Sequence, residues 1–122
     1  MPTFDILRRE ADNRSFKKGE TIFKDGDPGD CMFVVVEGAV EIHLAGTVVE
    51  RLDPGGLFGE MALIDGHARS ATAVAAADCS LAAINEKRFL RLVEITPRFA
   101  LQVMQVITER LRRKTGTGAH QH

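Results

Sequence analysis

Residues 57–74 read LFGEMALIDGHARSATAV and combine features that neither a simple strand nor a simple loop requires. Four apolar residues follow Gly59 and Glu60, enough for about one helical turn, whose first backbone N–H groups lack helical partners and attract an anion. Nine residues after Glu60, Arg69 offers a planar guanidinium that can donate two parallel hydrogen bonds to a phosphate, and Ser70 adds a hydroxyl. Glu60 is an acceptor suited to a sugar hydroxyl. The stretch therefore predicts a site for a sugar phosphate.

Short strands are predicted on both sides of this stretch. Nine of the eleven glycines lie between residues 19 and 66, where they separate short runs rich in Val, Ile and Phe, a pattern typical of turns between antiparallel strands. The predicted strands occupy residues 21–23, 31–37, 39–44, 47–52, 70–76 and 79–85. So many short strands predict an antiparallel β-roll, a jelly-roll-like barrel.

Helices are predicted after Asn85, because the apolar spacing changes there from about two to about 3.6 residues. Thr96 and Pro97 resemble an N-cap followed by proline at the first helical position, so one helix ends near Glu94 and the next begins there. The second helix is expected to end at Lys114, in a run of cations that includes Arg110 and favours the C-terminal end of the helix dipole.

The chain ends complete the predicted organisation. A short amphipathic helix is expected over residues 4–11, and residues 115–122 are expected to form a disordered tail. The predicted fold class is α+β, with one domain over residues 1–114 in which N- and C-terminal helices flank the roll and a short helix lies within it.

Composition excludes several classes of function. Sixteen Lys and Arg against seventeen Asp and Glu give a net charge of -1, so no global basic field attracts nucleic acid or an anionic membrane. Cys31 and Cys79 are too few for a disulfide scaffold and lack zinc-ligand spacing, so both are predicted to be reduced, packed thiols. No apolar run reaches the roughly 18 residues of a membrane span, and no signal core begins the chain, so a cytoplasmic location is expected.

The stretch at residues 57–74 resembles the phosphate-binding cassette of cyclic-nucleotide-binding domains, found in kinase regulatory subunits, gated channels and catabolite-activator-type regulators. Residues upstream resemble the entry strands of this family in the same order. They are Phe16, Lys18, Gly19, Glu20, Ile22, Phe23, Gly26, Asp27, Gly29, Asp30, Phe33, Val35, Gly38 and Val40. The resemblance covers residues 12–114 and implies a β-roll with flanking helices, in agreement with the reading of the strands and helices above.

The resemblance also implies a role for each residue of the cassette. Arg69 would bind the cyclic phosphate and Glu60 the ribose 2'-hydroxyl, with Gly59 close to the ribose and the Ala62 N–H donating to the phosphate. Ser70 stands where members carry Ala, Ser or Thr; threonine is associated with guanine preference in part of the family, so the implied ligand is cyclic AMP, with cyclic GMP open. Met61 is either a ligand contact or a core residue, whereas Phe58 and Leu63 are expected in the core. The last helix is implied to swing towards the occupied pocket.

Alternative interpretations remain. Glu60 and Arg69 could form only a surface ion pair, worth ~0 to 1 kcal/mol, and the domain could be a degenerate protein-interaction scaffold. No nucleophile with a base and no cupin-type metal site is recognisable, so neither an enzyme nor a metal or cofactor is expected. A DNA-binding regulator would need a helix-turn-helix domain of several dozen residues after Lys114. Only eight residues follow, so DNA binding is not expected of this chain. An effector protein or a second copy could pair with the C-terminal helix.

Overall fold

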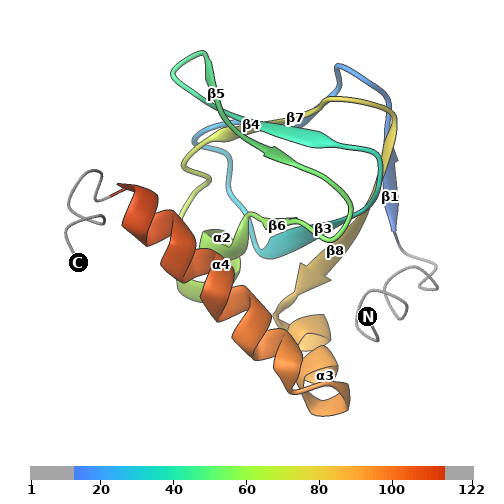
Figure 1. The fold of residues 1–122 in the computed structure, drawn as a ribbon, viewed down its shortest axis with the longest axis vertical. Helices are drawn as coiled ribbons and strands as arrows, with labels where there is room; N and C mark the ends of the chain where they lie inside the picture. The colour runs from blue at the N-terminus through green and yellow to red at the C-terminus, as the bar shows by residue number, and fades with distance from the viewer. Residues whose placement is uncertain (1–12, 115–122) are drawn as a thin grey trace.

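The computed structural model describes residues 13–114, which form two four-stranded antiparallel sheets, a short helix and two C-terminal helices (Figure 1). In chain order the elements are β1 (Arg14–Phe16), β2 (Thr21–Phe23), β3 (Cys31–Glu37), β4 (Val40–Leu44), β5 (Thr47–Leu52), β6 (Leu57–Phe58), α2 (Glu60–Asp65), β7 (Thr72–Ala75), β8 (Cys79–Asn85), α3 (Glu86–Ile95) and α4 (Arg98–Lys114). The sheets have the strand orders β1-β8-β3-β6 and β2-β7-β4-β5. This is the predicted β-roll. The helix expected over residues 4–11 and the tail expected over 115–122 lie outside the described residues.

The six predicted strands are present, with small differences at their ends. The strand predicted over residues 39–44 begins at Val40, and the one predicted over 70–76 covers only Thr72–Ala75. The second difference arises because Arg69 bonds to the loop before β3: its N–H donates to Asp27 O at 2.8 Å and its C=O accepts from Gly26 N at 2.7 Å. The chain before Thr72 is therefore held by a loop and not by the sheet.

Two strands, β1 and β6, were not predicted. In β6, Leu57 pairs with Val34 and Phe58 with Phe33, at the edge of the first sheet. A two-residue strand cannot display a period of two, so its pairing partner and not its own pattern defines it. Within residues 57–74 a strand was predicted only from residue 70 onwards, so these two positions were missed.

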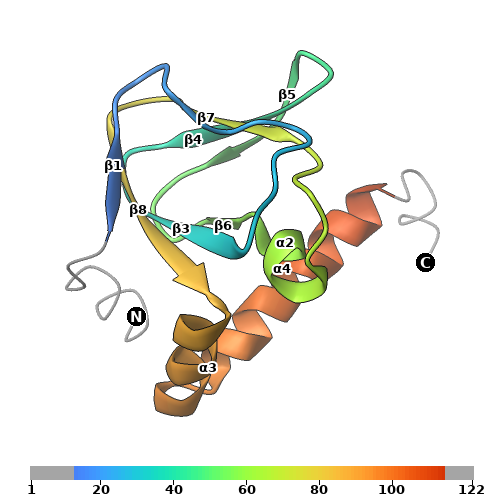
Figure 2. The same ribbon diagram turned by 180° about the vertical axis from the view of Figure 1, so that it is seen from behind.

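Strand β3 supplies both halves of the hydrophobic core. Its successive side chains point to opposite faces, and all residues from 31 to 36 are buried. One face packs with the C-terminal helices in a cluster that includes Met32, Val34, Val36, Leu92, Phe99 and Val103. The other face lies inside the roll in a cluster that includes Cys31, Phe33, Val35, Phe58 and Leu81. Figure 2 shows α3 and α4 beside the sheet that contains β3 and β8.

The break between α3 and α4 lies where the sequence predicts it. Helix α3 ends at Ile95, one residue beyond the expected end, and Thr96 is its C-cap. The Thr96 carbonyl accepts from Phe99 N at 2.9 Å, which closes the first turn of α4 around Pro97. Because proline has no N–H to donate, the two helices cannot be one continuous ladder of hydrogen bonds.

The predicted apolar stripe of α4 divides into buried and exposed parts. Phe99 and Val103 are 1% and 3% exposed, whereas Met104 and Leu111 are 57% and 55% exposed. Ile107 lies between these extremes and packs against the helix-facing core cluster. The helix therefore docks on the roll through one edge of its apolar face.

Both cysteines are free and buried, as predicted. Burial, reinforced by the charge of Asp78, raises the pKa of the Cys79 thiol, so this side chain is neutral near pH 7. None of the helices in residues 13–114 combines the length and hydropathy that a bilayer crossing requires.

Candidate functional site

Arg69 lies buried in the loop between α2 and β7, with only 7% of its surface exposed. Its Cζ is 4.2 Å from the centroid of the Phe23 ring, its Nη1 donates to the Gly59 carbonyl at 3.0 Å, and its Nη2 contacts Cys31 Sγ at 3.8 Å. Its buried Nε has no hydrogen-bond partner among residues 13–114. No carboxylate in that range pairs with it either. Arg69 is thus a buried cation with donors to spare.

Two glycines make room for this guanidinium. A Cβ built on Gly29 would lie 2.4 Å from Arg69 Nε, and one on Gly59 would lie 2.7 Å from Nη1. Gly59 also has a φ of 76°, the left-handed conformation that favours glycine, and it is the N-cap of α2. A side chain at either position would have to displace Arg69.

Glu60 begins α2 and is only 5% exposed. Its Oε1 accepts from Arg110 Nη1 at 2.5 Å, although Arg110 lies on α4, fifty residues later. Arg110 also donates to both carboxylate oxygens of Glu50, at 3.1 and 3.2 Å, and to the Leu57 carbonyl. Burial by itself lowers the pKa of Arg110, but the hydrogen bond to Glu50 and the charges of Glu60 and Glu50 outweigh it and raise that pKa, so Arg110 stays charged.

The two charges predicted for the site therefore have different surroundings. Glu60 is neutralised by Arg110, whereas Arg69 has no opposite charge in the described part of the chain. The alternative in which Glu60 and Arg69 pair with each other on the surface is wrong. A buried cation that lacks a counter-ion is an arrangement that accommodates an anion.

The remaining predicted residues surround these two. Ala62 is buried in α2, and no side chain within residues 13–114 caps the N-terminus of that helix. Ser70 is exposed directly after Arg69. Met61 is 48% exposed and is not a core residue, whereas Phe58 is 2% exposed and belongs to the core as predicted.

Four residues of the site were not predicted to belong to it. Phe23 and Gly29 contact or border the Arg69 guanidinium, and Glu50 and Arg110 surround the Glu60 carboxylate. The sequence contains a signal for Phe23 and Gly29, which both belong to the series that resembles the entry strands of the family, but none for Glu50 or Arg110. Arg110 was expected only as one of the cations at the helix end, whereas the structure pairs it with Glu50 and Glu60 at a side-chain exposure of 21%.

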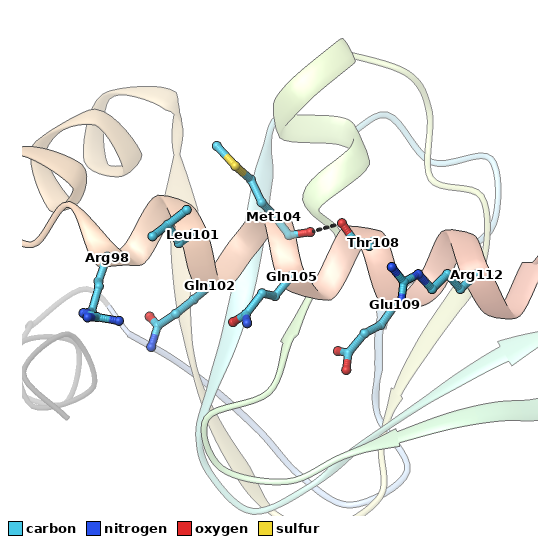
Figure 3. Close-up of a pocket in the computed structure, with 8 residues that line it drawn as sticks. All are labelled: Arg98, Leu101, Gln102, Met104, Gln105, Thr108, Glu109 and Arg112. Atoms are coloured by element: carbon cyan, nitrogen blue, oxygen red, sulfur yellow. Dashed lines mark hydrogen bonds between the residues drawn. The ribbon is translucent and has the colours of Figure 1, made fainter. Parts of the chain in front are cut away.

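Two cavities are alternative positions for the site. One cavity of about 570 Å³ runs along α4 and is lined by none of the predicted site residues (Figure 3). It is lined by Arg98, Leu101, Gln102, Met104, Gln105, Thr108, Glu109 and Arg112. A second cavity of about 540 Å³ borders Gly29 and Ala62. Because Arg69 and Glu60 carry the distinctive chemistry, we place the candidate site at them and not at the cavity along α4. The described residues contain no group of three His, Cys, Asp or Glu positioned to hold a metal ion.

Comparison with known families and sequences gives a consistent result. The family model described as the cyclic nucleotide-binding domain matches residues 13–96. The cyclic AMP receptor protein of Thermus thermophilus is 38% identical over 113 residues, which cover 88% of this chain and 52% of that protein. A cyclic nucleotide-gated potassium channel of Mesorhizobium japonicum is 44% identical over 87 residues, which cover 71% of this chain and 24% of the channel. The chain thus spans about half, or less, of these relatives.

Solved structures agree with the sequence relatives. The crystal structure of the Thermus thermophilus catabolite activator protein matches with a TM-score of 0.78 and 34% identity, over 93% of this chain and 56% of that one. The EAL enzyme Bd1971 matches in a cyclic AMP-bound form, with a TM-score of 0.62, 34% identity and coverage of 84% and 29%, respectively. Its cyclic GMP-bound form matches with a TM-score of 0.64, 35% identity and coverage of 88% and 30%.

Proposed function

The chain belongs to the cyclic nucleotide-binding domain family, and on this basis we propose that it is a regulatory sensor whose preferred ligand is cyclic AMP. The observation that carries the proposal is the state of Arg69, a buried guanidinium with an unpartnered Nε and no carboxylate beside it within residues 13–114. A buried donor without an acceptor costs about 1–3 kcal/mol. A cyclic phosphate would accept hydrogen bonds from that donor and supply the missing negative charge.

The rest of the ligand is assigned to neighbouring residues. In this proposal the Ala62 N–H and the Ser70 hydroxyl donate to the phosphate, while Glu60 accepts from the ribose 2'-hydroxyl. Gly59 has no side chain that would block the approach of the ribose to the backbone. A Cβ at this position would also lie 2.7 Å from Arg69 Nη1. Met61, which is exposed beside them, contacts the outer side of the ligand.

The preference for cyclic AMP rests on relatives and not on a contact with the base. The Thermus receptor protein is named for cyclic AMP, whereas the EAL enzyme was solved with either nucleotide. In part of the family a threonine at the position of Ser70 is associated with a preference for guanine. Serine at this position leaves the choice of base open, so cyclic GMP is the second candidate ligand.

Thermal unfolding of the chain with and without cyclic AMP tests the proposal. At a ligand concentration about a hundredfold above Kd, linkage stabilises the native state by ~2.7 kcal/mol, which raises the Tm by about 10 °C. Circular dichroism is the suitable signal because the chain has no Trp or Tyr. Adenosine, which lacks the phosphate, is the control and is expected to cause no shift. If millimolar cyclic AMP and cyclic GMP both leave the Tm unchanged, the ligand-free scaffold is the better interpretation.

The role of Glu60 is tested by removing its charge. Glu60→Gln should weaken binding of cyclic AMP more than binding of 2'-deoxy cyclic AMP, because only the first ligand has a hydroxyl that donates to this carboxylate. Hydrogen bonds to charged groups contribute about 1.5–3 kcal/mol, so a loss of roughly tenfold or more is expected for the ribose ligand. Calorimetric titration of both nucleotides measures this difference. Equal losses for the two ligands would remove the 2'-hydroxyl assignment.

We also propose that the domain reports occupancy through α4 and has no catalytic role of its own. Arg110 connects this helix to Glu60, and the exposed Met104 and Leu111 leave an apolar surface for an effector protein or a second copy of the chain. Residues 1–114 would form this single sensor domain. The free thiols support a cytoplasmic location, where cysteines stay reduced.

A further inference from the structure

We propose that Glu50 is a positioning residue for the ribose end of the nucleotide site and acts through Arg110; this inference rests on the proposed function. Arg110 makes four hydrogen bonds to three separate segments, and two of the four go to Glu50 on β5. The other two go to Glu60 at the start of α2 and to the Leu57 carbonyl in β6. Glu50 therefore accepts half of the hydrogen bonds that the Arg110 guanidinium donates.

The geometry of the guanidinium explains why Glu50 controls Glu60. Nε and Nη2 of Arg110 face the two oxygens of Glu50, a bidentate arrangement that fixes the plane of the guanidinium. The third nitrogen, Nη1, then projects from the opposite edge and reaches Oε1 of Glu60. No hydrogen bond within residues 13–114 uses Oε2 of Glu60, which leaves this oxygen for the ribose hydroxyl.

The fold directs the Glu50 side chain to this place. The pairing of β4 with β5 shifts by one residue between Ile42–Glu50 and His43–Val48, so Val49 is an extra residue in a β-bulge. After the bulge, Glu50 and the buried Leu52 lie two residues apart and share one face of β5. Glu50 is consequently only 19% exposed at its side chain, although its neighbour Arg51 is exposed.

Charge in this cluster is balanced. Glu50 and Glu60 supply two negative charges, while Arg110 and the more exposed Arg113, whose Nη2 is 3.7 Å from Glu50, supply two positive ones. Replacing Glu50 by a neutral residue leaves two cations around a single carboxylate and releases the bidentate hold on Arg110. Arg110 would then keep only its hydrogen bonds to Glu60 and the Leu57 carbonyl, so the plane of its guanidinium, and with it the orientation of Glu60, would no longer be fixed.

The first experiment measures the affinity for cyclic AMP and for 2'-deoxy cyclic AMP in Glu50→Gln. We expect about a tenfold loss for cyclic AMP and less than about a twofold loss for the deoxy ligand, as for groups coupled through shared partners. A residue that only stabilises the fold would weaken both ligands equally, and that result would overturn the proposal. Glu109→Gln is the matched control, because Glu109 is exposed on α4 and forms no ion pair within residues 13–114.

The second experiment needs no ligand and separates this inference from the proposed function. Hydrogen exchange of residues 106–114 is expected to accelerate severalfold in ligand-free Glu50→Gln and to remain unchanged in Glu109→Gln. Unchanged exchange in Glu50→Gln would show that Glu50 does not hold Arg110 and would overturn the inference. If the unaltered chain bound neither nucleotide, the proposed function would fail, whereas accelerated exchange would still support the hold of Glu50 on Arg110.

Discussion

Replacing Arg69 with lysine is expected to weaken binding of cyclic AMP about 30-fold or more, which corresponds to ~2 kcal/mol. Lysine keeps the positive charge but loses the planar fork, and the donors of Arg69 point in directions that an ammonium group cannot reproduce. Nη1 of Arg69 already donates to the Gly59 carbonyl, and this hydrogen bond fixes the orientation of the guanidinium. The remaining N–H donors are then available to the phosphate. Calorimetric titration of the unaltered chain and the variant measures the loss.

The fold is expected to survive this substitution. Arg69 has no carboxylate partner within residues 13–114, so no ion pair is broken when its side chain changes. Arg91→Lys, at an exposed position of α3, is the matched control and should leave both affinity and Tm unchanged. Binding by Arg69→Lys that equals that of the unaltered chain would locate the phosphate elsewhere.

Phe99→Ala is expected to lower the free energy of unfolding by about 3–5 kcal/mol, the range for truncating a buried aromatic side chain. Phe99 is 1% exposed, its ring centroid is 5.5 Å from that of Phe89, and it belongs to the core cluster formed with β3. Truncation would leave a cavity between α4 and the sheet. For a domain of this size, the Tm should fall by roughly 12 °C or more.

The control for this variant is on the same helix. Leu101→Ala removes a side chain that is 57% exposed two residues away, and surface substitutions of this kind change stability by only about 0.5 kcal/mol. Urea titration followed by circular dichroism compares the two variants. Similar losses in both would mean that α4 is not docked through Phe99.

Helix α4 has two separate roles, one at each end. Phe99 attaches the first turn of the helix to the core, and Arg110 contacts the site eleven residues later, roughly 16 Å along the axis. A truncation after Thr96 would therefore remove part of the core as well as the contact with Glu60, because it deletes Phe99 along with Arg110. Point substitutions such as Glu50→Gln separate docking from coupling, whereas truncation cannot.

The amino-acid sequence by itself determined the main elements and the identity of the cassette. Glycine at the turns, apolar alternation in the strands and the change of period after Asn85 are local signals, because each depends on backbone preferences within a few residues. The break at Pro97 is local for the same reason. Arg69 and Glu60 were recognisable because their spacing lies within one continuous stretch.

Tertiary structure alone decided how these residues are surrounded. Glu50, Glu60 and Arg110 meet across fifty or sixty positions of the chain, and Gly29 borders Arg69 from forty residues upstream. Such meetings depend on strand register, on the bulge at Val49 and on the docking of α4. A contact between distant segments leaves no periodic trace in either segment, so only the folded chain reveals that the Glu60 carboxylate is paired and the Arg69 guanidinium is not.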